Sequence, residues 1–551
     1  MSQPAFGRLR VERRELRLLS VTALFAFSSV TLAILIRTWS DTLFLRTFPA
    51  EEIPFFYVMS ALLFFPTTMG YTWIAQRSTP LILNQRALLC FAILTTSALL
   101  LPSTPPVIFS VILLLALISP LVNAICWSMI LEQFSSRQAR RLVPLIGGIS
   151  TAGAAAGGLL SAELIEGWGE QALMLVIVGL LLLMVPFPRW VTRVGLALRE
   201  ERVGDEDESD PLPPKQPEKA PRANSGAEVK AAPRAEDRSF LDALKILAHN
   251  RLLQSAGLAT LLLAIATNLV DYSLKEIVKE TLSPDEIGPF FARFHGLVNL
   301  SILFLQFTVV TPTLSRLGVR RSFQLHPFGI LICTVVALFA PSLWALVALR
   351  AVDTAMKFSF QSSTENLLLT PVPFAERASA KVILKGAIYP IGGLIAGLLL
   401  MGTGGEERVL WTILVASFLW LIVTDRVQIY YLEQLAKNLK LSLQPRKGGR
   451  KTRTQREALT ALRSMSGEGE MVQFDFLEAQ LALALAQPQL RGQLWPLLEA
   501  KGDHRRADLI EWIELSLQSE GLAHFGEKIE QLQFRDTVED NVDRTGGRDV
   551  G

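Results

Sequence analysis

The sequence has little charge and almost no cysteine for its length. Of 551 residues, only 19% are charged and 50% are hydrophobic, whereas about 25% of a soluble domain is charged. Such a chain cannot hide its apolar side chains in one aqueous core, so the composition predicts a membrane protein with the lipid bilayer as its solvent. Lysine and arginine (54) nearly balance aspartate and glutamate (51), which argues against a nucleic-acid-binding protein.

Sites for catalysis or metal are also missing. The three cysteines, Cys90, Cys126 and Cys333, each lie alone in an apolar run, and the five histidines are scattered. A disulfide framework or a zinc site would need clustered spacing. The sequence contains no phosphate-binding glycine loop ending in Lys-Ser or Lys-Thr and no His-Glu-x-x-His motif, which argues against an ATP-driven pump and a zinc protease. We therefore expect no enzyme activity, no cofactor and no metal.

Long apolar runs are what the sequence does have. A helix needs about 20 apolar residues to cross a hydrocarbon core. The chain contains twelve such runs, six before and six after a polar gap. They predict an all-α membrane protein of twelve transmembrane helices at residues 16–36, 53–75, 87–101, 107–131, 142–165, 171–190, 252–274, 290–311, 324–340, 342–362, 382–401 and 410–430.

Basic residues are distributed unevenly between the loops and therefore predict the orientation. They gather at the N-terminus, in the polar gap and in alternate loops, whereas the opposite loops carry acidic residues such as Glu51, Glu166 and Glu406. Because basic loops stay on the cytoplasmic side, both termini and the gap are expected in the cytoplasm. We expect a bacterial inner-membrane protein.

The two sets of six runs resemble each other. Residues 52–56 (EIPFF) return at 286–291 (EIGPFF), and a series of residues between 134 and 160 returns 240 positions later. Two six-helix halves related in this way are typical of the major facilitator architecture. In each half the fifth helix carries a small-xxx-small pair, which allows helices to approach closely. We expect these glycines, Gly153, Gly157, Gly393 and Gly397, either to pack statically or to line a moving contact between the halves.

The boundaries of the domains follow from composition. Residues 1–193 are expected to form the first half and 239–431 the second. The acidic and proline-rich segment 194–238 predicts a disordered cytoplasmic linker, and an amphipathic helix is expected just after it. The polar tail, 432–551, has apolar residues at helical spacing and predicts either a small helical cytoplasmic module or a set of loose helices, and a cytoplasmic partner for this tail is one option.

Ionisable residues inside spans are costly unless they face a partner or a cavity, so they are the candidate site. Arg350, Asp353 and Lys357 stand at i, i+3 and i+7 on one face of the tenth helix. One acid between two bases leaves net positive charge, which suits an anionic substrate. The alternative is an internal ion-pair network that only holds helices together.

Further candidates lie near the ends of the expected spans. The substrate-binding candidates among them are Arg37, Asp41, Asp271, Lys275, Lys381 and Lys385, and the gating or structural candidates are Glu132, Glu365 and Arg141. At a helix end, a long side chain that reaches the membrane surface is as good an interpretation as one that binds substrate.

Several of these segments resemble the ATP/ADP translocases, which are nucleotide transporters of plastids and intracellular bacteria. The similar segments are 138–141 (QARR), 240–244 (FLDAL), 270–275 (VDYSLK), 290–294 (FFARF), 314–318 (LSRLG), 357–359 (KFS), 364–366 (TEN) and 371–373 (PVP). The resemblance implies a twelve-helix major facilitator-like bundle that exchanges nucleotides by means of charged residues in its cavity.

These observations lead to one main hypothesis and two alternatives. The main hypothesis is a secondary transporter that works by alternating access on an anionic, phosphorylated metabolite, in its sharpest version an ATP:ADP antiporter. One alternative is a major facilitator carrier for another small solute. The other is a membrane sensor or scaffold that acts through its cytoplasmic tail.

Overall fold

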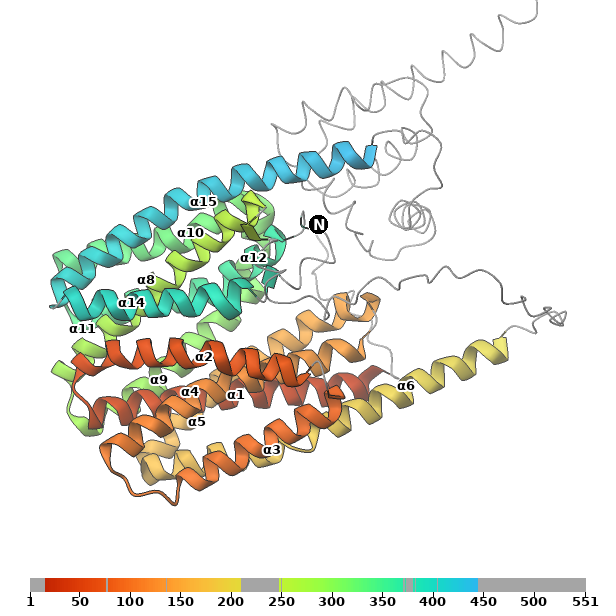
Figure 1. Ribbon diagram of the computed structural model, residues 1–551, viewed down its shortest axis with the longest axis horizontal. Helices are drawn as coiled ribbons and strands as arrows, with labels where there is room; N and C mark the ends of the chain where they lie inside the picture. The colour runs from red at the N-terminus through yellow and green to blue at the C-terminus, as the bar shows by residue number, and fades with distance from the viewer. Residues whose placement is uncertain are drawn as a thin grey trace, which may run out of the picture. The chain divides into compact units, whose positions relative to one another are not determined.

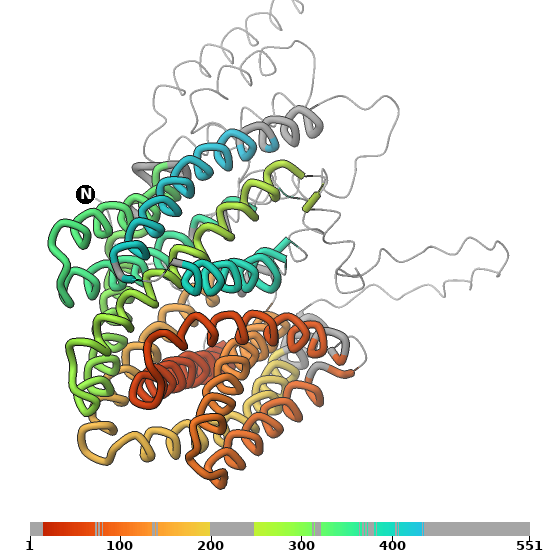
Figure 2. The backbone as a smooth tube through the Cα atoms, turned by 60° about the vertical axis from the view of Figure 1, so that its left-hand side comes forward, coloured from red at the N-terminus to blue at the C-terminus, as the bar shows by residue number. Residues whose placement is uncertain are grey.

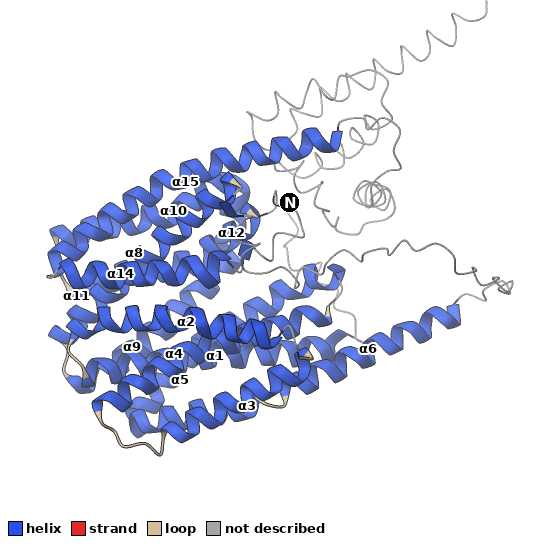
Figure 3. Ribbon diagram, in the orientation of Figure 1, coloured by secondary structure: helices blue, strands red, loops and turns tan. Residues whose placement is uncertain are grey.

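The computed structural model describes residues 15–75, 78–134, 136–209, 247–248, 250–369, 372, 380–381, 383–403 and 405–443. All regular structure in this part of the chain is helical (Figure 3). The chain divides into two compact units, Met1–Glu365 with Ala375–Asp425, and Asn366–Phe374 with Arg426–Gly551. The candidate site described below lies in the first unit, and the ends of two helices, Ser362–Leu368 and Glu406–Leu443, extend into the second.

Two groups of helices make up the first unit (Figure 1). The N half contains α1 (Glu15–Thr47), α2 (Ile53–Ala75), α3 (Pro80–Ala98), α4 (Pro105–Gln133), α5 (Ser136–Met184) and α6 (Phe187–Ser209), with the short η2 (Ala50–Glu52) before α2. The C half contains α8 (Arg251–Thr281), α9 (Pro284–Leu305), α10 (Thr311–Phe339), α11 (Leu343–Met356), α12 (Ser362–Leu368), α14 (Tyr389–Thr403) and α15 (Glu406–Leu443). Three π-helical turns interrupt this half, η4 (Gln306–Val310), η5 (Lys357–Gln361) and η6 (Leu384–Ile388).

The described helices fit a multi-pass membrane protein. Ten helical segments are long and apolar enough to cross a bilayer. One of them, Arg141–Leu198, has 58 residues, whereas one crossing needs about 20. Within it, α5 turns at Gly169, whose φ of 79° lies in the left-handed region that favours glycine. The prediction of an all-helical membrane protein is confirmed.

Several helices are longer than the apolar runs that predict them. Helix α1 continues to Thr47 and α8 to Thr281. Arg37, Asp41 and Lys275 therefore lie inside helices, and the expectation that they close helix ends is corrected. An apolar run is bounded where polar residues become frequent, but the backbone hydrogen bonds of the helix continue past that point when the polar side chains find partners inside the bundle.

Helical structure also extends into the expected linker and tail. Helix α6 covers 194–209, and α15 continues to Leu443. In both places the sequence keeps strong helix formers such as leucine, arginine, glutamate and lysine after the apolar run ends. The rest of the linker, the expected amphipathic helix after it and most of the tail lie outside the described residues.

Two pairs of helices make the most extensive contacts between the two halves, and α1 adds a smaller contact with α9. Helix α5 lies against α9, and α2 lies against α14 (Figures 1 and 2). A Cβ added at Gly158 of α5 would lie 2.3 Å from the backbone nitrogen of Gly296 on α9, and one at Gly397 of α14 would lie 2.8 Å from the carbonyl oxygen of Pro54. Missing side chains therefore let the backbones of opposite halves touch.

The four glycines singled out from the sequence divide between packing inside one half and contact between the halves. Gly153 and Gly157 face α1 of their own half, where added Cβ atoms would meet Thr31 at 3.0 Å and 3.1 Å, and Thr31 donates a hydrogen bond to the Gly153 carbonyl. Gly393 has open space, with only Asn268 at 3.7 Å. Of the four expected residues, only Gly397 lies between the halves. Helical spacing identifies glycine-rich faces, but the crossing geometry decides which helix each face meets.

Candidate functional site

The centre of the bundle holds a chain of buried ion pairs. Asp271 of α8 is its hub and accepts hydrogen bonds from four side chains. Two come from the N half, Arg37 Nη2 at 3.0 Å and the Tyr57 hydroxyl at 2.7 Å. Two come from the C half, Lys275 Nζ at 2.8 Å and Arg350 Nη2 at 2.6 Å. Asp271 therefore joins the halves.

Asp41 of α1 makes the reciprocal connection. Its Oδ1 lies 2.7 Å from Lys275 Nζ, and its Oδ2 lies 3.4 Å from His295 Nε2 of α9. Arg37, one turn before it on the same helix, is more distant at 3.7 Å. Each carboxylate thus takes a cation from the opposite half.

The series of ion pairs ends at Asp353, inside the C half. Arg350 uses the other arm of its guanidinium here, with Nη1 2.6 Å from Asp353 Oδ2. Asp353 Oδ1 accepts the Thr267 hydroxyl at 3.0 Å and lies 3.1 Å from His326 Nε2. His326 is fully buried and packs edge-on against Trp420, with ring centroids 4.8 Å apart. Asp353 has no exposed surface.

This network, defined as Arg37, Asp41, Asp271, Lys275, Arg350 and Asp353, carries three positive and three negative charges, so its formal sum is zero with neutral histidines. Removing one partner from a buried ion pair costs about 3–5 kcal/mol because the other charge remains buried. Both arms of Arg350 are occupied, and its side chain is 4% exposed. Among the cations of the network, Arg37 is the most open at 35%. Arg350 and Asp353 thus belong to a set of balanced charges, whereas Lys357, the second base of the same helix face, lies outside that set.

The network lies deep in the bundle. Asp271 precedes the end of α8 at Thr281 by ten residues, and Asp353 follows the start of α11 at Leu343 by ten. Ten residues of α-helix rise about 15 Å, which is half of a hydrocarbon core of about 30 Å. Buried charge at this depth makes the network the candidate functional site.

Lys357 lies one turn beyond the network and has a different environment. Its ammonium donates a hydrogen bond to the Tyr389 hydroxyl and lies 4.7 Å from the centroid of the Tyr389 ring. No carboxylate among the described residues lies within ion-pair distance of Lys357, which is only half-buried. The direct contacts of this cation are therefore the hydroxyl and the ring of Tyr389, and the nearest negative charge of the network is Asp353, one turn away on the same helix.

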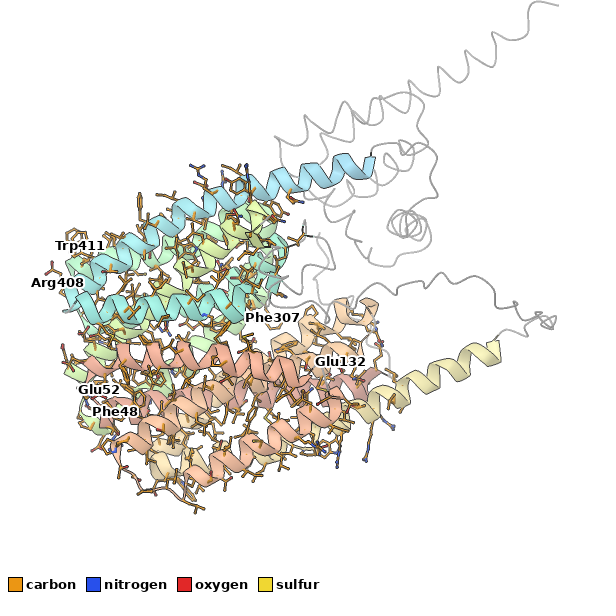
Figure 4. The ribbon with its side chains drawn as sticks, in the orientation of Figure 1. Phe48, Glu52, Glu132, Phe307, Arg408 and Trp411 are labelled. Carbon is orange, nitrogen blue, oxygen red and sulfur yellow. The ribbon has the colours of Figure 1, made fainter. Side chains whose placement is uncertain are left out.

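The remaining candidates lie nearer to the end of the bundle where α1 begins. Lys385 lies 3.5 Å from Glu365, and Lys381 is exposed. Arg141 pairs with Glu15 inside the N half. Glu132 is exposed near the end of α4, and Figure 4 labels it at the opposite end of the N half from Glu52.

At the end where α1 reaches Thr47, ion pairs join the two halves. Arg46 of α1 contacts Glu170 in its own half and Asp285 of α9 at 2.8 Å. Arg293 of α9 pairs with Glu166 of α5. These contacts hold the halves together at the Thr47 end.

The structure thus brings together six of the nine substrate-binding candidates, and Lys357, Lys381 and Lys385 lie outside the network. Sequence reasoning missed four members of the site, the side chains of Tyr57, Thr267, His295 and His326. A polar side chain inside an apolar run was the available signal. No group of three His, Cys, Asp or Glu residues in the described part could hold a metal ion.

Comparisons with known proteins bear on the fold. No family model matches the chain, and no curated protein matches it in sequence. The crystal structure of the nucleoside transporter NupG is similar, with a TM-score of 0.50 and 15% identity over 75% of this chain and 99% of that chain. A NupG point mutant has a TM-score of 0.50 at 16% identity, over 76% and 99% of the chains. A bacterial metal transporter gives 0.46 at 15% identity, over 75% and 98%.

The NupG likeness and the apolar helices together define the class. The chain is an integral multi-pass membrane protein whose helical fold is similar to that of NupG. At 15% identity, the likeness extends to the fold and not to the substrate.

Proposed function

We propose that the protein is a secondary transporter that moves an anionic, phosphorylated metabolite, such as a nucleotide, by alternating access. The observation that carries this proposal is Lys357, a half-buried cation in a membrane-length bundle with no carboxylate partner among the described residues. A lone cation in a membrane is costly unless it meets solvent or a ligand. A phosphate group supplies the missing charge, and an ammonium is a good point-charge partner for it.

Arg37 is the second contact that we assign to the substrate. It is the most exposed cation of the network, and its guanidinium reaches Asp271 of the other half. An anion that attracts Arg37 competes with this contact and so loosens the connection between the halves. We do not assign Arg350 to the substrate, because each arm of its guanidinium already contacts a carboxylate. Its role in this proposal is to hold the helices of the network together. Lys381 and Lys385 lie further toward the α1 start, where Lys385 already pairs with Glu365.

We further propose twelve crossings with both termini in the cytoplasm, in a bacterial inner membrane. The 58-residue segment with its turn at Gly169 supports two crossings where hydropathy alone counts one. Helix α11 is short, but η5 and α12 continue it, which supports another crossing. The basic loops support the orientation.

The test is uptake of labelled ATP and ADP into proteoliposomes, with and without nucleotide inside. We expect uptake by the wild type and its loss in Lys357→Gln. Arg251→Gln is the control, because Arg251 is an exposed cation at the start of α8. Uptake that requires internal nucleotide identifies an antiporter. Equal uptake by Lys357→Gln and the wild type refutes the role of Lys357.

A nucleoside is the second candidate substrate. The zero net charge of the network favours it, since a neutral solute needs no excess positive charge, and the similar protein NupG is named as a nucleoside transporter. Adding labelled adenosine and ATP to the same proteoliposomes separates the two candidates.

A further inference from the structure

Three π-helical turns mark one region of the C half. A π turn holds one residue more than an α turn, is unfavourable in isolation, and recurs at functional sites. Each of these turns places a long polar side chain in an otherwise apolar run: Gln306 in η4, Lys357 and Gln361 in η5, and Lys385 in η6.

The turns are connected to one another. Gln306 Nε2 of η4 donates to the carbonyl oxygen of Phe358 in η5 at 3.3 Å. Lys357 of η5 donates to the hydroxyl of Tyr389, the residue that directly follows η6. Gln306 therefore reaches the residue next to the cation that we assign to the substrate.

Gln306 also touches the opposite half. Its Oε1 lies 3.2 Å from the Thr151 hydroxyl of α5. The next residue, Phe307, lies against Gly148 of α5 and is labelled between the helices of the two halves in Figure 4. Gln306 thus lies at the boundary that alternating access must open.

The hydrogen-bonding capacity of Gln306 is only partly used. The single Thr151 hydroxyl proton is shared between Gln306 and the Gly147 carbonyl, which is closer at 3.0 Å. The Nε2 group has two protons, and the one contact it makes is long. A half-buried amide in this state offers one donor and one acceptor side by side.

We propose that Gln306 determines substrate specificity by pairing with the donor–acceptor edge of a nucleobase while Lys357 holds the phosphate. This inference rests on the proposed function and adds the residue that recognises the nucleobase, the uncharged part of the substrate. A glutamine amide fits the amino group N6 and the ring nitrogen N7 of adenine. A 6-oxopurine presents two acceptors, O6 and N7, at this edge and leaves the amide oxygen without a donor.

The test measures binding of ATP, ITP and ribose 5-phosphate to the purified full chain by ligand-induced thermal stabilisation. We expect the wild type to bind ATP about tenfold more tightly than ITP, which is within the discrimination of one good amide pair. Gln306→Met should bring the ATP:ITP ratio close to one and leave the affinity for ribose 5-phosphate unchanged. Gln254→Met, at the exposed start of α8, is the matched control and should keep the ratio.

Other results overturn the inference. An unchanged ratio in Gln306→Met, an equal loss for all three ligands, or equal wild-type affinities for ATP and ITP each exclude a specificity role. If the wild type binds none of the three, the proposed function itself fails, because ribose 5-phosphate has no base to read. If Gln306→Met does not insert, Gln306→Asn, which keeps the amide and shortens its reach, is measured against the same criteria.

Discussion

Arg37 and Asp271 are separated by 234 residues, and their side chains meet at 3.0 Å between Nη2 and Oδ1. The contact joins α1 to α8, the first helices of the two halves. Lys275 and Asp41 join the same two helices, this time with the cation on α8 and the carboxylate on α1, and Lys275 Nζ lies 2.7 Å from Asp41 Oδ1. When the halves separate, each of these four residues keeps an oppositely charged neighbour on its own helix, since Arg37 and Asp41, and Asp271 and Lys275, are spaced i, i+4.

Asp271→Asn should be among the most destabilising changes of the network. It removes the negative charge that faces Arg37, Lys275 and Arg350, and leaving a buried charge unpaired costs about 3–5 kcal/mol. Arg37→Gln should cost less because Arg37 is partly exposed. Thermal denaturation in detergent measures both. Arg293→Gln, from an exposed pair, is the control and should change stability by at most about 1 kcal/mol. An equal loss in all three variants contradicts this ranking.

Gly158→Ala should impair packing of the halves, whereas Gly393→Ala should be tolerated. A Cβ at Gly158 would lie 2.3 Å from the Gly296 backbone, which cannot move aside as a flexible side chain can, while the nearest atom at Gly393 is 3.7 Å away. Overpacking typically costs about 1–3 kcal/mol. Melting temperature and proteoliposome uptake should both fall in the first variant only. Normal behaviour of Gly158→Ala would show that α5 and α9 do not need this close contact.

Lys357→Gln and Arg350→Gln should separate binding from stability. Lys357 has no carboxylate partner in the described part, so Lys357→Gln leaves no acid uncompensated and should lose anion binding with little change in melting temperature. Arg350→Gln leaves Asp271 and Asp353 without their shared cation and should unfold at lower temperature. If Lys357→Gln is the less stable variant, or still binds ATP normally, then it is wrong to assign substrate binding to Lys357 and stabilisation of the bundle to Arg350.

The proposed orientation predicts which loops are accessible. A cysteine at Glu406 should react with a membrane-impermeant reagent added to intact cells, and one at Asp207 only after permeabilisation. Both positions are assayed in a background without the native cysteines, because Cys90 is exposed on the bundle surface. The reverse labelling pattern would overturn the topology and the assignment of the α1 start to the cytoplasm.

Single residues explain how far sequence reasoning could predict the site. Arg350 and Asp353 share a helix face at i, i+3, so their pairing follows from helical geometry, and the structure places them 2.6 Å apart. His326 and Tyr57 have no charged partner at i±3 or i±4 on their own helix. A lone histidine or tyrosine in an apolar run therefore has the same sequence pattern whether its side chain packs in the core or hydrogen-bonds to a site residue. Their partners, Asp353 and Asp271, lie on other helices.

The sequence by itself determined that this protein is a helical membrane protein, because long apolar runs interrupted by few charges have no stable alternative in water. It also identified the ionisable residues that must find partners, since bare charge is costly in a bilayer. Only the tertiary structure decided who those partners are. Hydropathy and helical spacing describe the residues of a single helix. Contacts between helices depend on how helices distant in the sequence cross, which only their packing sets. Such contacts include those of Asp271, of Gly158 with Gly296, and of Gln306.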